Sequence, residues 1–140
     1  MLEFDLPDHL SPRLLRAVAD HSFDAITITR AAGEDGPGEI VYVNDAFTDL
    51  TGYKADEVVG QTPGVLQGPN TEQSVLDRLS RRLSTGDVFH GETANYRKDG
   101  SEFMMEWKVV PVGEENGDGD ETYHVAVQRE APADEESTNS

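Results

Sequence analysis

Cysteine and histidine, the side chains that most often carry redox, metal and nucleophilic chemistry, offer little in this sequence. There is no cysteine, which excludes a disulfide, a thiolate zinc site, an iron–sulfur cluster and a cysteine nucleophile. The four histidines, His9, His21, His90 and His124, have no ligand spacing such as an i, i+4 pair. A haem would need one axial histidine, and His90 is the best placed, although an exposed or hydrogen-bonded histidine is the simpler interpretation. We therefore predict no metal centre.

Other catalytic patterns are missing as well. The sequence contains no Gly-x-Ser-x-Gly elbow and no phosphate-binding loop. Its 28 acidic residues make pairs of neighbouring carboxylates an expectation of chance, so such pairs do not indicate a glycosidase-type site. We predict that the protein is not an enzyme.

Three arginines, Arg78, Arg81 and Arg82, fall on or beside one face of a predicted helix. They could bind a phosphate or a protein partner. Cations near the C-terminal end of a helix are also favoured by the helix dipole, so a solvated helix face is the simpler interpretation.

The acidic, glycine-rich residues 113–120 resemble a calcium-binding loop only in composition. Counted from Asn116, the sixth position is Glu121, where a calcium loop needs glycine. The twelfth is Val127, where a calcium loop needs glutamate. We predict a hairpin loop at this place.

The overall charge constrains the partners and the environment. With 11 basic residues against 28 acidic ones, the formal net charge of -17 disfavours nucleic acid and anionic lipid, which both require a positive surface. An acid-rich, lysine-poor surface is typical of proteins that work in concentrated salt, where charge repulsion is screened. We predict a halophilic, archaeal cytoplasm, and an acidic mesophilic protein is the alternative.

The chain also lacks the features of a membrane or secreted protein. No apolar run approaches the roughly 20 residues that span a bilayer, and the N-terminal residues are acidic where a secretory signal is basic. A soluble, cytoplasmic protein is expected. At 140 residues the chain is long enough for one domain with its own core.

Hydrophobic patterning predicts an α+β domain whose five strands form an antiparallel sheet. A β-branched and aromatic run at 40–43 indicates a buried strand, and Asp-Gly in 98–100 indicates a tight turn between the two longest strands. The predicted strands are 25–30, 40–43, 89–97, 101–112 and 122–129.

Helices are expected mainly between the second and third strands. A short one should begin at Asn44 or Asp45 and end at Gly52, and a second should cover 55–59. The longest should be capped by Asn70 or Thr71 and bury Val75, Leu76, Leu79 and Leu83 on the core. A further amphipathic helix should start at Ser11 and Pro12 and carry an apolar stripe of Leu14, Leu15, Val18 and Ala19.

Three motifs in the first half of the chain resemble the PAS family of sensory domains. They are residues 42–47 (YVNDAF), 50–53 (LTGY) and 57–60 (EVVG). The resemblance covers roughly residues 20 to 130 and implies the PAS fold, with short helices on one face of the sheet. It implies a ligand cavity between that face and the helices at 45–83. The leading helix, with Leu2, Phe4, Leu6, Leu10 and Leu14, would pack on the sheet or pair with a second copy.

Within this family, the chain is similar to the light-sensing LOV branch. Residues 60–69 (GQTPGVLQGP) resemble the segment that carries a flavin-reactive cysteine in that branch. Residues 95–100 (NYRKDG) resemble its hairpin, and Val127 with Gln128 resembles its last strand. Pro63 stands where the reactive cysteine would be, so the resemblance implies a LOV-like domain that cannot form the photochemical adduct.

The same resemblance implies the residues of the ligand site. Gln67, Asn95 and Gln128 stand where amide side chains contact the polar edge of the flavin ring, a task that suits groups that both donate and accept. Met105 replaces a second asparagine, and Gly64 replaces an arginine that holds the flavin phosphate, a loss for which Arg78, Arg81 or Arg82 could compensate. Four aromatic residues would enclose the ligand: Phe47, Tyr96, Phe103 and Trp107.

The function implied is a non-enzymatic sensory module that binds a small planar aromatic ligand and relays the change to a signalling partner. The alternatives are a flavin-binding redox or light sensor without the adduct, and a ligand-free homodimerisation module whose pocket its own side chains fill. A homodimer is expected, with a histidine kinase or chemotaxis-type transducer as attached domain or partner. The expected division is a helical extension at 1–21, the PAS domain at 22–130 and an acidic tail or linker at 131–140.

Overall fold

A computed structural model describes residues 11–31, 38–113 and 122–132. The acidic loop from residue 114, the tail from residue 133 and the apolar residues Leu2, Phe4, Leu6 and Leu10 lie outside the described residues. Within the described ranges, no helix is long and apolar enough to cross a membrane.

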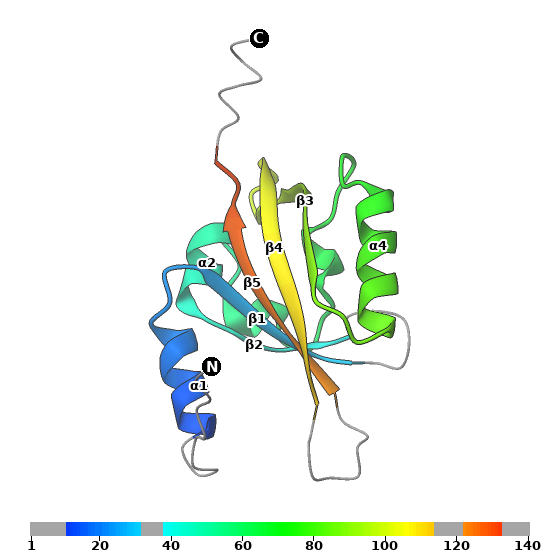
Figure 1. The fold of residues 1–140 in the computed structure, drawn as a ribbon. Helices are drawn as coiled ribbons and strands as arrows, with labels where there is room; N and C mark the ends of the chain where they lie inside the picture. The colour runs from blue at the N-terminus through cyan, green and yellow to red at the C-terminus, as the bar shows by residue number, and fades with distance from the viewer. Residues whose placement is uncertain (1–10, 32–37, 114–121, 133–140) are drawn as a thin grey trace.

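Five antiparallel strands form one sheet in the order β2-β1-β5-β4-β3 (Figure 1). The predicted α+β architecture is confirmed, and the predicted strand ends are within one residue of the observed ones. The strands are β1 (Ala25–Arg30), β2 (Ile40–Val43), β3 (Phe89–Tyr96), β4 (Glu102–Gly113) and β5 (Thr122–Glu130).

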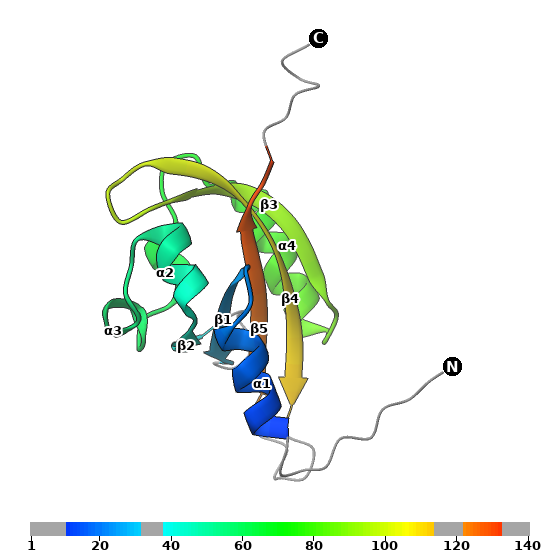
Figure 2. The same ribbon diagram turned by 90° about the vertical axis from the view of Figure 1, so that its left-hand side faces the viewer.

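Local capping defines both ends of the first helix between β2 and β3. Asn44 caps this helix by accepting a hydrogen bond from the Phe47 backbone amide, and Gly52, with φ of 82°, ends it in a left-handed conformation. The β3–β4 turn curls over this helix, where Lys98 N donates to Thr51 O at 2.8 Å (Figure 2). The helices are α2 (Asp45–Thr51), α3 (Ala55–Val58), the 3₁₀ helix η1 (Pro63–Leu66) and α4 (Gln73–Ser84).

The predicted start of α4 is wrong. The helix begins at Gln73, and its N-cap residue is Glu72, whose side chain makes no capping hydrogen bond. The Thr71 hydroxyl instead donates to Ala94 O at 2.7 Å, and the Glu72 amide donates to the hydroxyl of Thr93 at 2.7 Å. A threonine on strand β3 thus supplies the acceptor that a local cap usually gives.

The N-terminal helix α1 (Ser11–Asp20) forms as predicted, and only part of its apolar stripe packs on the rest of the chain. Ala19 is buried, whereas Leu14 and Val18 are 41% and 56% exposed. The last turn is tied down by two hydrogen bonds, from Asn44 to Ala19 O and from the Tyr42 hydroxyl to Asp20. Whether the exposed residues pair with a second copy stays a prediction.

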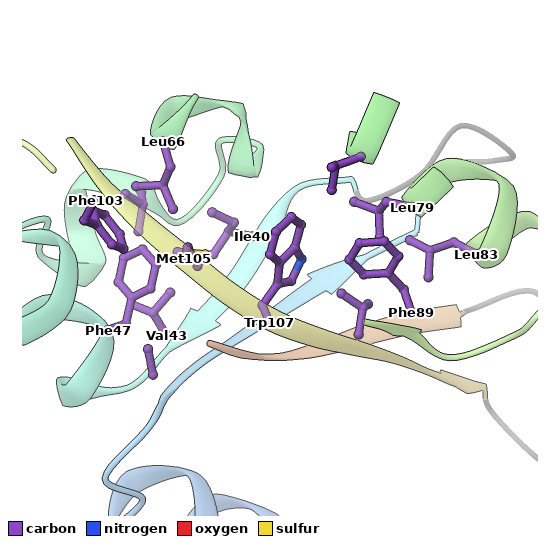
Figure 3. Packing of buried hydrophobic residues seen from close by; sticks show 14 residues of the cluster. Ile40, Val43, Phe47, Leu66, Leu79, Leu83, Phe89, Phe103, Met105 and Trp107 are labelled. Carbon is purple, nitrogen blue, oxygen red and sulfur yellow. The ribbon is translucent and has the colours of Figure 1, made fainter. Parts of the chain in front are cut away.

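Buried side chains form two groups on the helix-covered face of the sheet (Figure 3). One gathers around Phe47 and Phe103. The other gathers around Phe89 and Trp107, whose ring centroids are 5.1 Å apart. Strand β4 links the two groups because Phe103, Met105, Trp107 and Val109 alternate onto this face with the period of a strand.

Candidate ligand-binding site

A cavity of about 330 Å³ lies between the inner face of the sheet, η1 and α4. This volume is near the lower end of the range for small-molecule pockets. Its walls combine apolar side chains with a few polar ones, as ligand sites do. The described lining residues are Thr27, Thr29, Ile40, Phe47, Thr62, Pro63, Gly64, Leu66, Gln67, Leu76, Leu79, Ser80, Asn95, Met105, Trp107, Val109, His124, Ala126 and Gln128.

At one end of the cavity, two buried amides share a weak acceptor. The Nδ2 of Asn95 and the Nε2 of Gln128 both lie near the thioether sulfur of Met105, at 3.6 and 3.7 Å. Thioether sulfur accepts hydrogen bonds only weakly. The Oε1 of Gln128 accepts from the Thr27 hydroxyl at 2.6 Å. The amide end therefore holds N–H donors whose hydrogen-bonding capacity is largely unused.

Six of the eight predicted site residues line the cavity: Gln67, Asn95, Gln128, Phe47, Met105 and Trp107. Gln67 follows η1 and is exposed, whereas the other five are buried. The structure thus brings the three amides to one cavity. Whether they bind a ligand stays a prediction.

Tyr96 and Phe103 are not among the lining residues. The Tyr96 ring covers the backbone of Gly68, and its hydroxyl contacts Glu102 at 3.1 Å and accepts from Asn70 N at 2.9 Å. Tyr96 follows the inward-facing Asn95 and so turns to the other side of the strand. Phe103 is buried beyond the cavity, with the guanidinium of Arg97 4.4 Å from its ring centroid.

No fixed charge lines the cavity among the described residues. Pro63 and Gly64 are both on its wall, and their correspondence to the reactive cysteine and the phosphate-binding arginine stays a prediction. None of the three α4 arginines reaches it. Arg78 donates to His90 O at 2.8 Å and lies 5.0 Å from the ring centroid of Phe89.

Three buried polar residues of the site were not predicted from the sequence: Thr27, Thr29 and His124. Strand β1 alternates apolar and polar residues, and the usual expectation is that the isoleucines face inward. The structure shows that both threonines are buried and line the cavity, while Ile28 is half-buried. The alternation of β1 can be read from the sequence. Which of its two faces lies toward the cavity depends on the register with β5, where Thr29 pairs with His124.

His90, considered above as a haem ligand, does not reach the cavity. It lies on the other face of the sheet, where its Nε2 is 2.7 Å from an oxygen of Glu106. The same carboxylate accepts from Arg129 at 3.1 Å. Hydrogen bonds from these two side chains hold the pKa of Glu106 below its usual value. The described residues contain no cluster of three or more metal-binding side chains.

Comparison with known proteins identifies this fold and cavity. A family model described as a PAS domain matches residues 24–130. The chain belongs to the PAS family. The PAS domain is a sensory module, and this one is LOV-like and contains no cysteine.

Its curated relatives are longer signalling proteins. This PAS domain is 34% identical over 113 residues to the bacterioopsin transcriptional activator of Halobacterium salinarum, covering 81% of this chain and 16% of that protein. It is 35% identical over 91 residues to a blue-light-activated histidine kinase of Brucella anthropi, covering 65% of this chain and 18% of the kinase. The chain therefore corresponds to a small part of each.

Solved structures of LOV proteins have the same fold. An RNA-binding light-oxygen-voltage receptor superposes with a TM-score of 0.76 at 30% identity, covering 93% of this chain and 36% of the receptor. A light-oxygen-voltage domain studied with a flavin analogue superposes with a TM-score of 0.75 at 26% identity, covering 94% of this chain and 93% of that domain.

The residues present fit only part of a flavin mononucleotide. The amides suit the polar edge of the ring, and Phe47, Met105 and Trp107 offer apolar walls for a flat molecule. The phosphate would find no cation on the described cavity wall, and Pro63 has no thiol to react. This PAS domain therefore fits the ring and does not fit the phosphate or the adduct.

Proposed function

We propose that this PAS domain is a non-enzymatic sensor that binds a small, flat, uncharged heteroaromatic ligand in its cavity. The proposal rests on the N–H donors of Asn95 and Gln128, for which the described residues offer only the sulfur of Met105 as an acceptor. A ligand carbonyl or ring nitrogen is a much better acceptor. Each hydrogen bond gained would contribute about 0.5–1.5 kcal/mol.

The cavity wall also favours a particular size and charge of ligand. A volume of about 330 Å³ suits a few fused rings. Without a cation on the described wall, burial of a phosphate would cost the hydration of its charge without compensation. An unphosphorylated ring system is therefore preferred.

Ligand binding would be transmitted through the sheet. Gln128 is on β5, the central strand, which pairs with β1 on one side and β4 on the other. A ligand shifts a protein between two states only by binding one of them more tightly, so a change in the Thr27–Gln128 hydrogen bond would be the first step. Beyond Glu130 the chain leaves the sheet, and we propose that this end carries the change onward.

The partner would be an attached or separate signalling domain, such as a histidine kinase or a chemotaxis-type transducer. The kinase and activator relatives support this, since in both the matched region is a small part of a longer protein. We also propose that the domain is a cytoplasmic homodimer adapted to high salt. The division into 1–21, 22–130 and 131–140 belongs to the same proposal.

A flavin sensor without the adduct is the second candidate. Its support is the set of three amides on the cavity wall together with the LOV structures that share the fold. Such a sensor would have to bind a flavin without its phosphate or leave the phosphate outside the cavity. A ligand-free homodimerisation module remains the third candidate.

Replacement of Gln128 by leucine tests the proposal. We expect wild type to bind an uncharged alloxazine such as lumichrome, and Gln128→Leu to bind it about tenfold more weakly because a ligand hydrogen bond is lost. Fluorescence titration measures both affinities. Gln73→Leu is the matched control, since Gln73 is exposed on α4 and should leave the affinity unchanged.

Two results would separate the candidates. If wild type binds no alloxazine and both variants keep the same dimer, the homodimerisation module is correct and the sensor proposal fails. If wild type prefers flavin mononucleotide over lumichrome, the phosphate argument fails and the flavin sensor is favoured.

A further inference from the structure

The buried imidazole of His124 has a nitrogen without a partner. His124 is 5% exposed and lines the cavity. Its Nδ1 has no hydrogen-bond partner among the described residues. Of the buried side-chain nitrogen and oxygen atoms in the described part of the chain, this one alone lacks a partner.

His124 lies at the opposite end of the cavity from the amides. It is on β5 four residues before Gln128, so both side chains face the same side and their Cα atoms are roughly 13 Å apart along the strand. Between the two lies Ala126 of β5, which pairs with Val109 of β4 on one side and with Thr27 of β1 on the other. The Thr27 hydroxyl is bonded to Gln128 and so belongs to the amide end, which leaves His124 as a separate polar group at the other end of the cavity.

Thr29 adds a second polar side chain to the His124 end of the cavity. It pairs with His124 in the β1–β5 register, which places the two side chains within about 5.5 Å at their Cβ atoms. Thr29 is buried and lines the cavity as well. A hydroxyl and an imidazole thus lie next to each other on the cavity wall. Apolar residues in these two positions would avoid the cost of burying polar groups.

An unpaired imidazole nitrogen is costly in the free protein. Burial of a polar group without a partner is unfavourable, and a ligand that supplies the partner recovers that cost. The torsion between Cβ and Cγ of histidine is soft and roughly twofold, so rotation of the ring can turn either nitrogen edge toward the cavity.

We propose that His124 and Thr29 form a second polar ligand-binding site at the far end of the cavity. The ligand would be an elongated, flat, uncharged heteroaromatic that carries a hydrogen-bonding group at both ends. This inference rests on the proposed function, because it needs a ligand whose other edge is held by Asn95 and Gln128.

The chemistry of the far end follows from a neutral imidazole. Burial lowers the pKa of His124, so at neutral pH one ring nitrogen donates and the other accepts. A hydroxyl on the ligand satisfies either nitrogen because it donates and accepts, and an amino group satisfies the accepting nitrogen. A methyl group in the same place removes water from the imidazole and offers nothing in exchange. The site should therefore reject a ring whose far edge carries only methyl groups.

Two alloxazines that differ at one edge test this. Lumichrome carries methyl groups at positions 7 and 8, and 8-hydroxy-7-methylalloxazine carries a hydroxyl at position 8. We expect wild type to bind the hydroxylated ring at least about tenfold more tightly in a fluorescence titration. His124→Phe should lose this preference, and His124→Gln, which can still donate and accept, should retain part of it.

A stability measurement guards against a structural role of the histidine. Without ligand, His124→Phe should be at least as resistant to chemical denaturation as wild type, because it removes an unpaired buried nitrogen. Marked destabilisation, or equal binding of both rings by wild type, would overturn this inference and leave the proposed function in place. Binding of neither ring would overturn both.

Discussion

Two parts of the core contain buried amides in opposite states. At the packed end, Asn44 uses all of its capacity: its Oδ1 accepts from Ile26 N and Phe47 N, and its Nδ2 donates to Ala19 O and Asp24 O. At the cavity, the only acceptor that the described part of the chain gives the Nδ2 of Asn95 is the Met105 sulfur.

The difference separates the residues that determine the fold from those available for binding. Asn44 joins β1, α1 and α2 through four hydrogen bonds, so no ligand is needed to satisfy it. Asn95 and Gln128 have N–H donors with only a weak acceptor among the described residues. A buried polar group with good partners stabilises one structure, whereas one with poor partners favours a ligand.

Loss of the Asn44 side chain should have the largest effect on stability. Asn44→Ala removes four hydrogen bonds to backbone groups, of which Phe47 N and Ala19 O keep one other partner each, so we expect a loss of about 3 kcal/mol in the free energy of unfolding. Chemical denaturation measures it. Asn70→Ala is the control, since Asn70 is exposed, and should change stability by less than about 0.5 kcal/mol. Similar values for both variants would remove the contrast between the two ends.

The cavity end should tolerate apolar replacement. Gln128→Leu alone leaves the buried Thr27 hydroxyl without its acceptor and should cost about 1–2 kcal/mol. The double variant Thr27→Val, Gln128→Leu removes both partners and should return to within about 1 kcal/mol of wild type in the same assay. A double variant that is less stable than either single variant would show that this polar pair serves the fold instead.

Loss of the hydrogen bond from Tyr42 to Asp20, which helps to hold α1, should have a smaller effect on stability. Burial, together with the hydrogen bond to Asp20, raises the pKa of Tyr42 to about 12. Because the folded-state pKa is raised, this contribution to stability is complete below pH of about 10 and is lost as the pH rises through about 12. Tyr42→Phe should cost less than about 1 kcal/mol and speed amide exchange in residues 11–20. Unchanged exchange there would mean that Asn44 and Ala19 hold the helix alone.

The face of the sheet that carries Glu106 should contribute least to stability. Changes there should affect neither Asn44 nor the cavity amides. Glu106 has a lowered pKa because it accepts from His90 and Arg129. Its contribution is therefore present above the unfolded-state pKa and is lost as the pH falls from about 5 to about 3. The denaturation midpoint of wild type should fall slightly more over this range than that of Glu106→Gln. Equal slopes would show that the pair adds nothing, as many surface pairs do.

The fold was more predictable from the sequence than the site. Short-range patterns placed the strands, and Asn44 with Gly52 gave the ends of α2, because capping depends on neighbouring residues. The start of α4 was missed since its acceptor, Thr93, comes from another strand. Likewise the inward direction of Thr27 and Thr29 depends on the register with β5, which a local pattern does not reveal.

The three amides of the site were predicted from the family resemblance and not from the chemistry of the residues alone. Gln67, Asn95 and Gln128 are distant in sequence and meet only through the antiparallel order of β3, β4 and β5 and the position of η1. Tyr96 and Phe103 were carried over as aromatic residues near the motif, although alternation turns Tyr96 away from the face of Asn95.

Nitrogen-15 NMR of the side-chain amides tests the central claim most directly, with Asn44 as an internal control. The protein is titrated with whichever of the two alloxazines binds more tightly. We predict that the Asn95 and Gln128 side-chain signals shift until one ligand is bound per chain, while the Asn44 signal stays in place. Shifts confined to other residues, or no shift at saturating concentration, would contradict a ligand site at these amides.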